Sequence, residues 1–434
     1  MSHAGNRPAM HLPAADEHAA RRTAAGDRPL RVLLLLSSLH GGGAERVALH
    51  LLNGLDPRRF QVTMGLLRAA GPYLAEADPR RVMVAERGDE RFAFDGANAA
   101  MYRPAKLLRG LIEAPRAFRA MIEANRPDVV VSFLKGTNLI AWRALAGLAG
   151  PRPRWIAREG NNVLAVIAEE TPGPLAARLV AGLTARAYRS ADRVLTISSA
   201  LAGDISGDLG LDPDRVAMIH NPVAIDQIRR LAGEPLPDAP RRPFVLTAGR
   251  MEVQKAHDVL LRAFAASAPA THDLVILGEG SQRAELNALA EALGLAGRVR
   301  FPGFVGNPFA WMAACDLFVL PSRWEGFGSA LAEAQAAGAA VLATDCRYGP
   351  GEIVEHGTSG WLVPVDDEPA LAQAMQTLLD DEALRRRLAA GGGHSVERFR
   401  LEAILARYGA LFDEVAQPAA LALAEGVGGG PNRR

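Results

Sequence analysis

Short apolar runs alternate with longer amphipathic stretches along most of this 434-residue chain. A first series of apolar runs covers residues 31–36, 61–67, 128–133, 154–157, 193–197 and 216–219. A second series covers residues 244–248, 273–277, 298–301, 317–320 and 340–343. Continuous apolar runs of this length are typical of strands that are buried on both faces of a parallel sheet, and helical patterns separate them. The pattern predicts an α/β fold.

Two series of strands in a chain too long for one hydrophobic core predict two doubly wound, Rossmann-like domains. We place the first domain at residues 30–232 and the second at 244–395. The polar, proline-rich stretch 233–243 is the expected linker, and residues 396–416 are expected to form a closing helix. Residues 1–29 and 417–434 lack periodicity and are expected to be disordered tails.

Two carboxylates flank a glycine-bearing turn directly after the apolar run 317–320. Glu325 and Glu333 lie eight positions apart, with Gly326, Phe327 and Gly328 between them. The segment predicts a strand, a turn and a helix, and a helix N-terminus presents unpaired N–H groups that suit a phosphate. A helix that starts near Phe327 would place Glu333 about two turns into it. The two carboxylates would then flank one elongated ligand, and a nucleotide-sugar has that shape.

Further motifs follow one another in order through the second half of the chain. Gly249-Arg250 follows a predicted strand, Lys255 comes five residues after Arg250, and Gly278 and Gly303 follow later strands. A segment from Asp345 to Glu352 closes the set. Over residues 30–415 this ordered set resembles the retaining glycosyltransferases of family 4. The resemblance implies the GT-B fold, in which two Rossmann-like domains face a cleft. The set is most similar to the subgroup that builds bacterial surface glycans and often uses UDP-N-acetylhexosamines.

The resemblance implies a role for each charged residue of the set. Arg250 and Lys255 are expected to bind the donor diphosphate, where negative charge develops during transfer. Lys255 is one of only three lysines in the chain, which favours a compact point charge at this position. Glu325 is expected to contact the donor sugar and Glu333 the ribose hydroxyls. The other donor-binding positions implied in the second half are Gly249, Gly278, Gly303, Gly326, Phe327, Gly328 and Ser329.

A glycine run in the first half is a second candidate phosphate loop. Gly42 and Gly43, which follow Gly41 after the first strand, would let the backbone approach the donor closely. An ordinary tight turn is the alternative interpretation. Arg46 stands where the last glycine of a dinucleotide fingerprint would be, so that kind of site is not favoured.

The acceptor-side candidates follow two strands of the first half. They are Asn138, Arg158, Glu159 and Asn161. Loops at the carboxyl ends of parallel strands are where such sheets bind ligands. Ordinary loop polarity explains these residues equally well.

Charge is unevenly distributed between the two halves. Residues 1–222 carry a net charge of +7 and the remainder −6. Six basic residues lie among apolar ones at Arg103, Lys106, Arg109, Arg116, Arg119 and Arg126. Such a basic amphipathic surface suits an anionic bilayer or a lipid diphosphate, and a solvated helix face is the alternative. Nucleic acid is not expected as a partner, since no aromatic platform accompanies the charge.

Neither a metal nor a cofactor is expected. Asp212-Pro-Asp214 matches a metal-binding string but lies in a segment typical of a turn or helix cap. His257 and His394 are expected at the surface or at helix caps rather than in catalysis. A nucleotide-sugar would be a substrate and not a cofactor.

Location and activity complete the expectations. The chain shows no secretory signal and no apolar run near the length of about 18 residues that spans a bilayer. With Cys315 and Cys346 as buried thiols, a cytoplasmic protein is expected, either free or at the inner face of the cell membrane. The resemblance implies metal-independent, retaining transfer from a UDP-sugar to a lipid-linked glycan or lipopolysaccharide. A nucleotide-sugar epimerase and a non-catalytic nucleotide-sugar-binding subunit are the alternatives.

Overall fold

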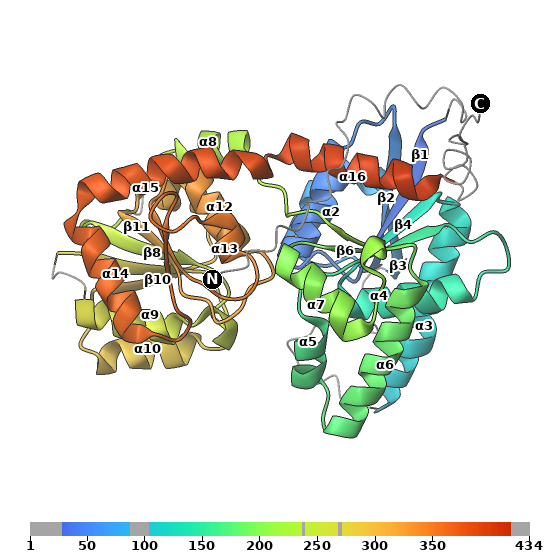
Figure 1. The fold of residues 1–434 in the computed structure, drawn as a ribbon, viewed down its shortest axis with the longest axis horizontal. Helices are drawn as coiled ribbons and strands as arrows, with labels where there is room; N and C mark the ends of the chain where they lie inside the picture. Colours follow the sequence, from blue (N-terminus) through green and yellow to red (C-terminus); the bar gives the residue numbers. More distant parts are fainter. Residues whose placement is uncertain (1–27, 87–103, 237–238, 268–270, 418–434) are drawn as a thin grey trace, which may run out of the picture.

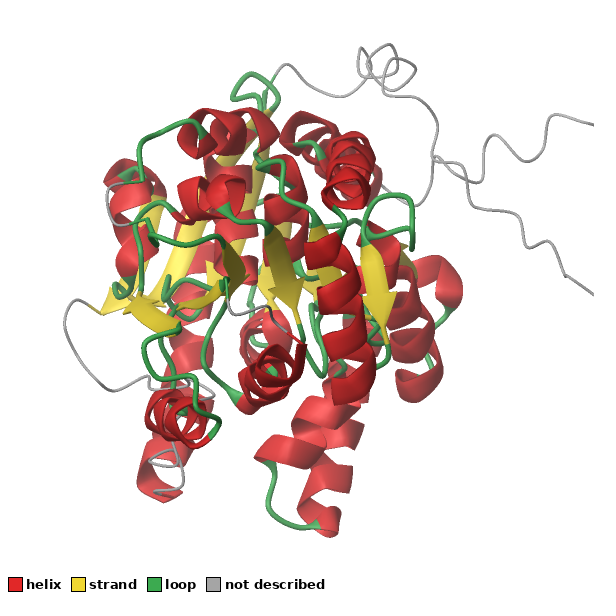
Figure 2. Cartoon of the chain, turned by 90° about the vertical axis from the view of Figure 1, so that its left-hand side faces the viewer, coloured by secondary structure: helices red, strands yellow, loops and turns green. Residues whose placement is uncertain are grey.

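Two parallel sheets, each in its own domain, lie side by side in the computed structural model (Figure 1). The structure describes residues 28–86, 104–236, 239–267 and 271–417. Figure 2 shows helices above and below the strands of the second domain, which faces the viewer there. The predicted α/β architecture with two Rossmann-like domains is therefore confirmed.

The first sheet has seven strands in the order β3-β2-β1-β4-β5-β6-β7, with every described pair parallel. The strands are β1 (Leu30–Leu36), β2 (Phe60–Arg68), β3 (Val82–Glu86), β4 (Val129–Phe133), β5 (Arg154–Arg158), β6 (Arg193–Thr196) and β7 (Val216–Met218). The helices are α2 (Gly43–Gly54), α3 (Pro104–Asn125), α4 (Leu134–Ala146), α5 (Val163–Glu170), α6 (Pro174–Ser190) and α7 (Ser199–Leu209). Short 3-10 turns are η2 (Pro72–Glu76), η3 (Pro79–Arg81) and η6 (Pro213–Arg215). The strand order reverses at β1, and ligands bind at such a reversal.

The second sheet has six strands in the order β10-β9-β8-β11-β12-β13. The strands are β8 (Phe244–Ala248), β9 (Asp273–Leu277), β10 (Val299–Gly303), β11 (Leu317–Leu320), β12 (Val341–Thr344) and β13 (Trp361–Val363). The helices are α8 (Ile225–Ala232), α9 (His257–Ser267), α10 (Arg283–Ala292), α11 (Pro308–Ala314), α12 (Ser329–Ala336), α13 (Pro350–Ile353), α14 (Glu368–Asp380), α15 (Glu382–Ser395) and α16 (Leu401–Ala416). The 3-10 turns are η7 (Val253–Lys255) and η8 (Val396–Phe399). Here the order reverses at β8, so the loops after β8 and β11 are the expected ligand loops.

All predicted strands are present, and the sequence missed two others. Both β3 and β13 lie at sheet edges, and β13 is only three residues long. A short edge strand has too few apolar positions to stand out from a loop.

The boundary between the domains differs from the prediction. Helix α8 lies within the predicted first domain but packs on α11 and α12 of the second. Its Ile225 and Ile228 are buried, and Asn307 Nδ2 donates a hydrogen bond to Leu231 O at 2.9 Å. The chain therefore leaves the first domain before α8, ahead of the linker predicted at 233–243. The predicted boundary is too late in the sequence because the apolar face of α8 packs on the second domain. The periodicity of α8 shows that it has an apolar face but not which domain that face contacts.

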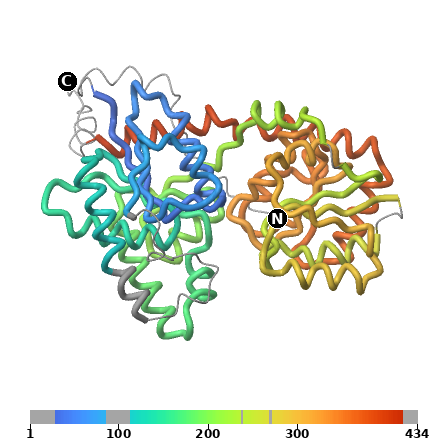
Figure 3. Tube along the Cα trace, turned by 180° about the vertical axis from the view of Figure 1, so that it is seen from behind, coloured from blue at the N-terminus to red at the C-terminus, as the bar shows by residue number. Residues whose placement is uncertain are grey.

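Helix α16 packs on α2 and β4 of the first domain. Seen from behind in Figure 3, the red C-terminal segment runs across both domains. The helix proper begins at Leu401, after the 3-10 turn η8, and not at residue 396. Its Phe412 is buried and its ring lies edge-on to Phe60 at 6.1 Å.

The predicted tails lie almost wholly outside the described residues. Arg28, within the predicted N-terminal tail, is described and pairs with Asp128 at 2.7 Å.

Candidate active site

The turn with the paired glutamates lies at the carboxyl end of β11. Gly328 has a φ of +91°, a left-handed conformation that favours glycine, and α12 begins at Ser329. Glu333 is therefore the fifth residue of α12, little more than one turn into it. The prediction that the helix starts near Phe327 is wrong, because Gly328 has a left-handed conformation and the helix can begin only after it. Phe327 is instead buried, with its ring 5.1 Å from that of Phe399.

A buried ion pair joins two of the predicted catalytic residues. Lys255, at the end of η7, donates from Nζ to Glu325 Oε1 at 2.5 Å. The same oxygen accepts from Ser322 Oγ at 2.7 Å. The side chains of Lys255 and Glu325 are 16% and 8% exposed, so each charge depends on the other for compensation. The pair forms because β8 and β11 are neighbours in the sheet.

Arg250 follows Gly249, whose added Cβ would lie 3.4 Å from the side chain of Lys255, and the charge of Arg250 acts on Glu45 of the first domain. Arg250 is exposed, and within the described ranges its side chain makes no hydrogen bond or ion pair. The loops around it are built from glycine. An added Cβ on Gly278 would lie 2.1 Å from Gly249 O, and Gly278 N donates to Gly303 O at 2.9 Å. These three predicted donor-site glycines pack the loops after β8, β9 and β10 against one another.

The glycine loop of the first domain meets the start of α12. An added Cβ on Gly43 would lie 3.8 Å from both Ser329 Oγ and Asn221 Nδ2. Gly42 precedes it as the N-cap of α2. Gly326 also touches the first domain, since a Cβ there would lie 2.0 Å from the carbonyl oxygen of Gly160. The glycines Gly43 and Gly326 therefore lie where the two domains meet.

Glu333 lies at the same boundary, close enough to the first domain for the charge of Arg46 to act on it. Within the described chain no side chain or backbone group makes a hydrogen bond to its carboxylate. Burial raises the pKa of Glu333 to about 7, and only the charge of Arg46 on α2 acts to lower it. Arg46 is itself paired with Glu76 and lies over the ring of Tyr73 at 3.7 Å. The site thus holds a carboxyl group with no charged partner bound to it.

A second carboxyl group lies at the boundary between the domains. Burial raises the pKa of Glu45, at the start of α2, while the charges of Arg250, His40 and Arg158 lower it. Its Oε2 lies against Gly42, where an added Cβ would come within 2.4 Å. Neither Glu45 nor Arg46 was singled out as a ligand residue from the sequence. The only indication of such a role in the sequence is that both residues directly follow the glycine loop.

The acceptor-side candidates lie mostly beneath the surface. Asn138 accepts from Ser132 Oγ at 2.6 Å and donates to Tyr188 OH at 2.9 Å. Tyr188 in turn donates to Glu159 Oε2 at 2.6 Å. Asn138 and Glu159 are 0% and 1% exposed, so in this conformation they support loops. Asn161, by contrast, is exposed.

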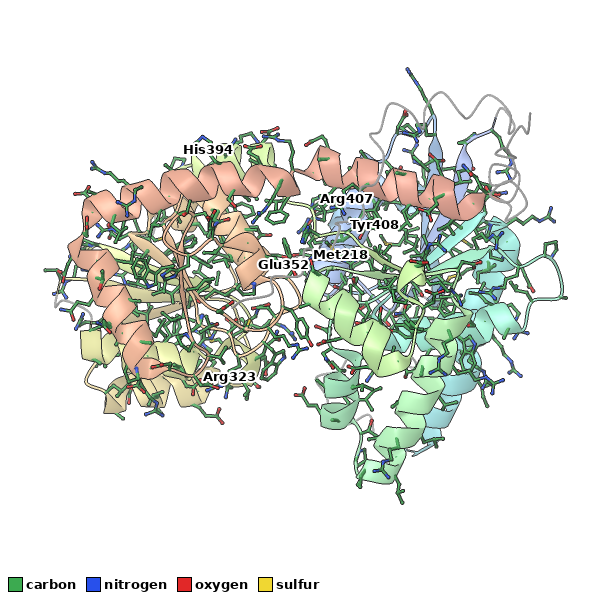
Figure 4. The ribbon with its side chains drawn as sticks, in the orientation of Figure 1. Met218, Arg323, Glu352, His394, Arg407 and Tyr408 are labelled. Carbon is green, nitrogen blue, oxygen red and sulfur yellow. The ribbon has the colours of Figure 1, made fainter. Side chains whose placement is uncertain are left out.

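Arg158 links three parts of the chain. It is buried, donates from Nη2 to Asn221 Oδ1 at 2.6 Å and from Nε to Tyr408 OH at 2.9 Å. Tyr408 comes from α16, and Figure 4 shows it on the part of that helix that covers the first domain. Arg158 therefore ties the returning helix to the loop that carries Asn221 toward the cleft.

The closing motif of the sequence holds the two domains together. Glu352 accepts from Ser199 N at 2.7 Å and from His220 Nε2 at 2.8 Å, and Figure 4 places it where the domains meet. Tyr348 OH accepts from Asn162 Nδ2 at 2.8 Å and donates to Asp204. These contacts join the second domain to α5 and α7 of the first.

Comparison with known proteins gives the family. The model of a glycosyl transferase 4-like domain matches residues 42–222, and the model of glycosyl transferases group 1 matches residues 234–393. A relative from Campylobacter jejuni subsp. jejuni serotype O:2 is 31% identical over 259 residues, which are 60% of this chain and 69% of that protein. This chain belongs to the family 4-like glycosyltransferases. The Campylobacter relative is N-acetylgalactosamine-N,N'-diacetylbacillosaminyl-diphospho-undecaprenol 4-alpha-N-acetylgalactosaminyltransferase.

Two further similarities extend over most of this glycosyltransferase. The lipopolysaccharide core biosynthesis glycosyltransferase LpsE of Rhizobium meliloti is 27% identical and covers 85% of this chain and 94% of its own. The crystal structure of Anabaena Alr3699/HepE in complex with UDP-glucose matches with a TM-score of 0.71 at 20% identity, covering 89% of this chain and all of that one. The structural match shows the GT-B fold.

Two other predictions concern the aspartates at Asp212 and Asp214 and the position of His257. Asp212 caps η6 by accepting from the backbone N of Asp214 at 3.1 Å, so the interpretation as a turn is confirmed. His257, expected at the surface or at a helix cap, does not lie at the surface. It is 1% exposed at the start of α9, and burial lowers its pKa to about 3. The left-handed turn at Ala256, with a φ of +49°, precedes this inward-facing residue.

Two further features concern metal ions and membranes. Among the described residues, no three His, Cys, Asp or Glu side chains are grouped so that they could hold a metal ion. The described helices include none that is long and apolar enough to span a membrane. Of the predicted basic surface, Arg103 lies outside the described residues, and Arg116 and Arg126 are exposed.

Proposed function

We propose that this glycosyltransferase moves a hexose or N-acetylhexosamine from a UDP-sugar to a lipid-linked glycan or lipopolysaccharide, with retention of anomeric configuration. One observation carries the proposal. The exposed Arg250 and the buried Lys255–Glu325 pair lie on the loops after β8 and β11, at the same boundary between the domains as the carboxyl group of Glu333, which has no hydrogen-bond partner among the described residues. Positive charge at one point and a hydrogen-bond acceptor at another suit a diphosphate and a ribose.

The chemistry follows from that distribution of charge. The bond from the anomeric carbon to the β-phosphate oxygen breaks, and a bond to the acceptor oxygen forms on the same face. The acceptor proton goes to the departing phosphate, so no protein base is assigned. Arg250 and Lys255 would stabilise the charge that develops on the phosphate, and Glu325 the positive charge at the anomeric carbon.

The pair of Lys255 and Glu325 serves this step best if it is in place before the donor binds. Preorganised charges need no rearrangement at the moment of reaction. Backbone N–H groups at the turn before α12 and at Gly43 would complete the phosphate site. Glu333 would accept hydrogen bonds from the ribose hydroxyls.

The names of the relatives support the choice of substrates. The Anabaena structure holds UDP-glucose, and the Campylobacter relative is named for transfer to a diphospho-undecaprenol glycan. The Rhizobium relative is named for lipopolysaccharide core synthesis. For the acceptor, we assign contact to the exposed Asn161, with Asn138, Arg158 and Glu159 holding its loop from below.

The experiment is nucleotide release from UDP-, GDP- and ADP-sugars, with and without bacterial lipid extract. We expect release of UDP that requires the extract and is lost in Glu333→Ala. Isomerised donor formed without any acceptor would favour a nucleotide-sugar epimerase. Nucleotide binding without release from any donor would favour a non-catalytic binding subunit.

A further inference from the structure

Trp324 is the most exposed tryptophan of this chain, at 41%. The other four of the five tryptophans are buried or half-buried, and all five lie within the described ranges. Large aromatic side chains gain from burial, and at binding surfaces they carry much of the affinity. Trp324 directly precedes Glu325, so it belongs to the turn that carries the candidate active site.

The backbone that presents Trp324 is held by the neighbouring loop after β8. Arg323 N donates to Gln254 O at 2.8 Å, and Gln254 Nε2 donates to Trp324 O at 2.9 Å. Arg323 also donates from Nη1 to Val253 O at 2.8 Å. Val253 is itself 53% exposed, so both bonded loops carry an exposed apolar side chain. A surface that is fixed before its ligand arrives loses little conformational entropy on binding.

The charged neighbours of Trp324 in the sequence are both paired within the protein. Arg323 pairs with Asp258 at 3.0 Å and with Asp366 at 2.8 Å. Glu325, on the other side, is held by Lys255. Neither charge is therefore offered to an ionic ligand, and a neutral one is favoured. A pyranose ring is neutral, and its C–H groups suit the negative face of an indole.

The position of Trp324 favours the acceptor over the donor. Gly326, two residues later, lies against the first domain, since an added Cβ would come within 2.0 Å of Gly160 O. Asn161, to which we assign contact with the acceptor, follows Gly160 and is exposed. Glu325, to which we assign contact with the donor sugar, lies between Trp324 and Gly326 in the chain. A sugar bound between Asn161 and Trp324 would therefore lie next to the donor sugar.

We propose that the indole of Trp324 binds the pyranose ring of the acceptor glycan that receives the transferred sugar. The inference rests on the proposed function, because it assigns a specificity-determining residue to the same transfer. The acceptor ring stacks on the indole, and Asn161 of the first domain contacts its hydroxyl groups. The donor sugar is the competing occupant, because Trp324 is adjacent to Glu325.

The first test is the rate of UDP release by the full chain over a range of lipid-extract concentrations and, separately, of UDP-sugar concentrations. In Trp324→Ala the extract concentration that gives half the maximal rate should rise about tenfold or more, because an aromatic contact and its apolar burial are lost. The maximal rate and half-saturation by the UDP-sugar should not change, as expected when only acceptor binding is weakened. Trp324→Phe keeps an aromatic ring and should recover most of the acceptor affinity.

Quenching of tryptophan fluorescence by acrylamide tests the same contact without any transfer. The probes are the methyl glycosides of glucose, galactose and their N-acetylamino derivatives. At least one should reduce quenching in wild type and none in Trp324→Ala, while glycerol, which has hydroxyl groups but no ring, should reduce it in neither. Phe304 of the second domain is 73% exposed, and the matched control Phe304→Ala should behave as wild type in both tests.

Three results would overturn the proposal. One is half-saturation of Trp324→Ala at the same extract concentration as wild type, and another is quenching that no glycoside reduces in wild type. The third is protection of Trp324 by the UDP-sugar without any glycoside, which would place the donor sugar on the indole. Failure of the proposed function is observed separately, as glycoside protection of wild type with no UDP release from any donor in the presence of extract.

Discussion

Replacing Glu333 by glutamine should make the protein more stable and its donor site weaker. The carboxyl group has no hydrogen-bonded partner in the described chain, and burial raises its pKa from 4.5 to about 7. Between these two values the folded protein holds a proton that the unfolded chain has released. The free energy of unfolding therefore falls as pH rises from about 4.5 to about 7, and stays constant above that range.

The size of the effect follows from the pKa difference. A difference of this size corresponds to a loss of up to about 3 kcal/mol of stability above pH 7. Glutamine does not titrate. The free energy of unfolding of Glu333→Gln should therefore equal that of wild type below pH 4.5 and exceed it by up to about 3 kcal/mol at pH 8. Urea unfolding at pH 5 and pH 8 measures the difference.

Donor binding should change in the opposite direction. Hydroxyl groups of the ribose donate to the ionised carboxylate, so UDP should bind wild type about tenfold more tightly at pH 8 than at pH 6. Glu333→Gln should bind about tenfold or more weakly at pH 8, because a hydrogen bond to a charged group is lost, and should show little pH dependence. Titration calorimetry with UDP at both pH values measures this. Unchanged UDP affinity, or lower stability at pH 8, would refute the reasoning.

Three further predictions concern the ion pair, the metal and the acceptor side. Lys255→Ala should slow transfer about 100-fold or more in single-turnover assays, and it should destabilise the protein because it leaves Glu325 buried without its partner. Lys255→Ala/Glu325→Ala should recover stability without recovering activity. Transfer by Lys255→Ala at the wild-type rate would contradict this. Activity should persist in EDTA, and restoration by manganese alone would count against the account. Asn138→Ala should lower unfolding free energy by about 1–3 kcal/mol in urea, because its buried partners lose hydrogen bonds, while calorimetric UDP affinity stays unchanged. A loss of UDP affinity would place Asn138 at the donor instead.

Local patterns predicted most of what positions the site. Each predicted strand is a short apolar run, and the turn at Gly328 is a glycine between a strand and a helix. Glu325, Gly328 and Glu333 could therefore be placed at one sheet edge before any contact was known. The start of α12 was missed because the left-handed conformation of Gly328 depends on its surroundings.

Contacts between distant residues could not be predicted. The hydrogen bond from Arg158 to Tyr408 joins positions 250 residues apart, and the pair of Lys255 and Glu325 spans 70. The hydrophobic pattern around one residue of each pair does not indicate which distant residue it contacts. The burial of His257 has the same origin, since neighbouring elements of the second domain enclose it.

The most direct test of the central claim is mass spectrometry of the bacterial lipid extract after incubation with the protein and a UDP-sugar labelled with ¹³C in the sugar. The account predicts a labelled product one sugar heavier than its acceptor, formed by wild type and absent with Lys255→Ala. Labelled donor recovered intact or isomerised across the panel of UDP-sugars, with no labelled acceptor in any fraction, would contradict it.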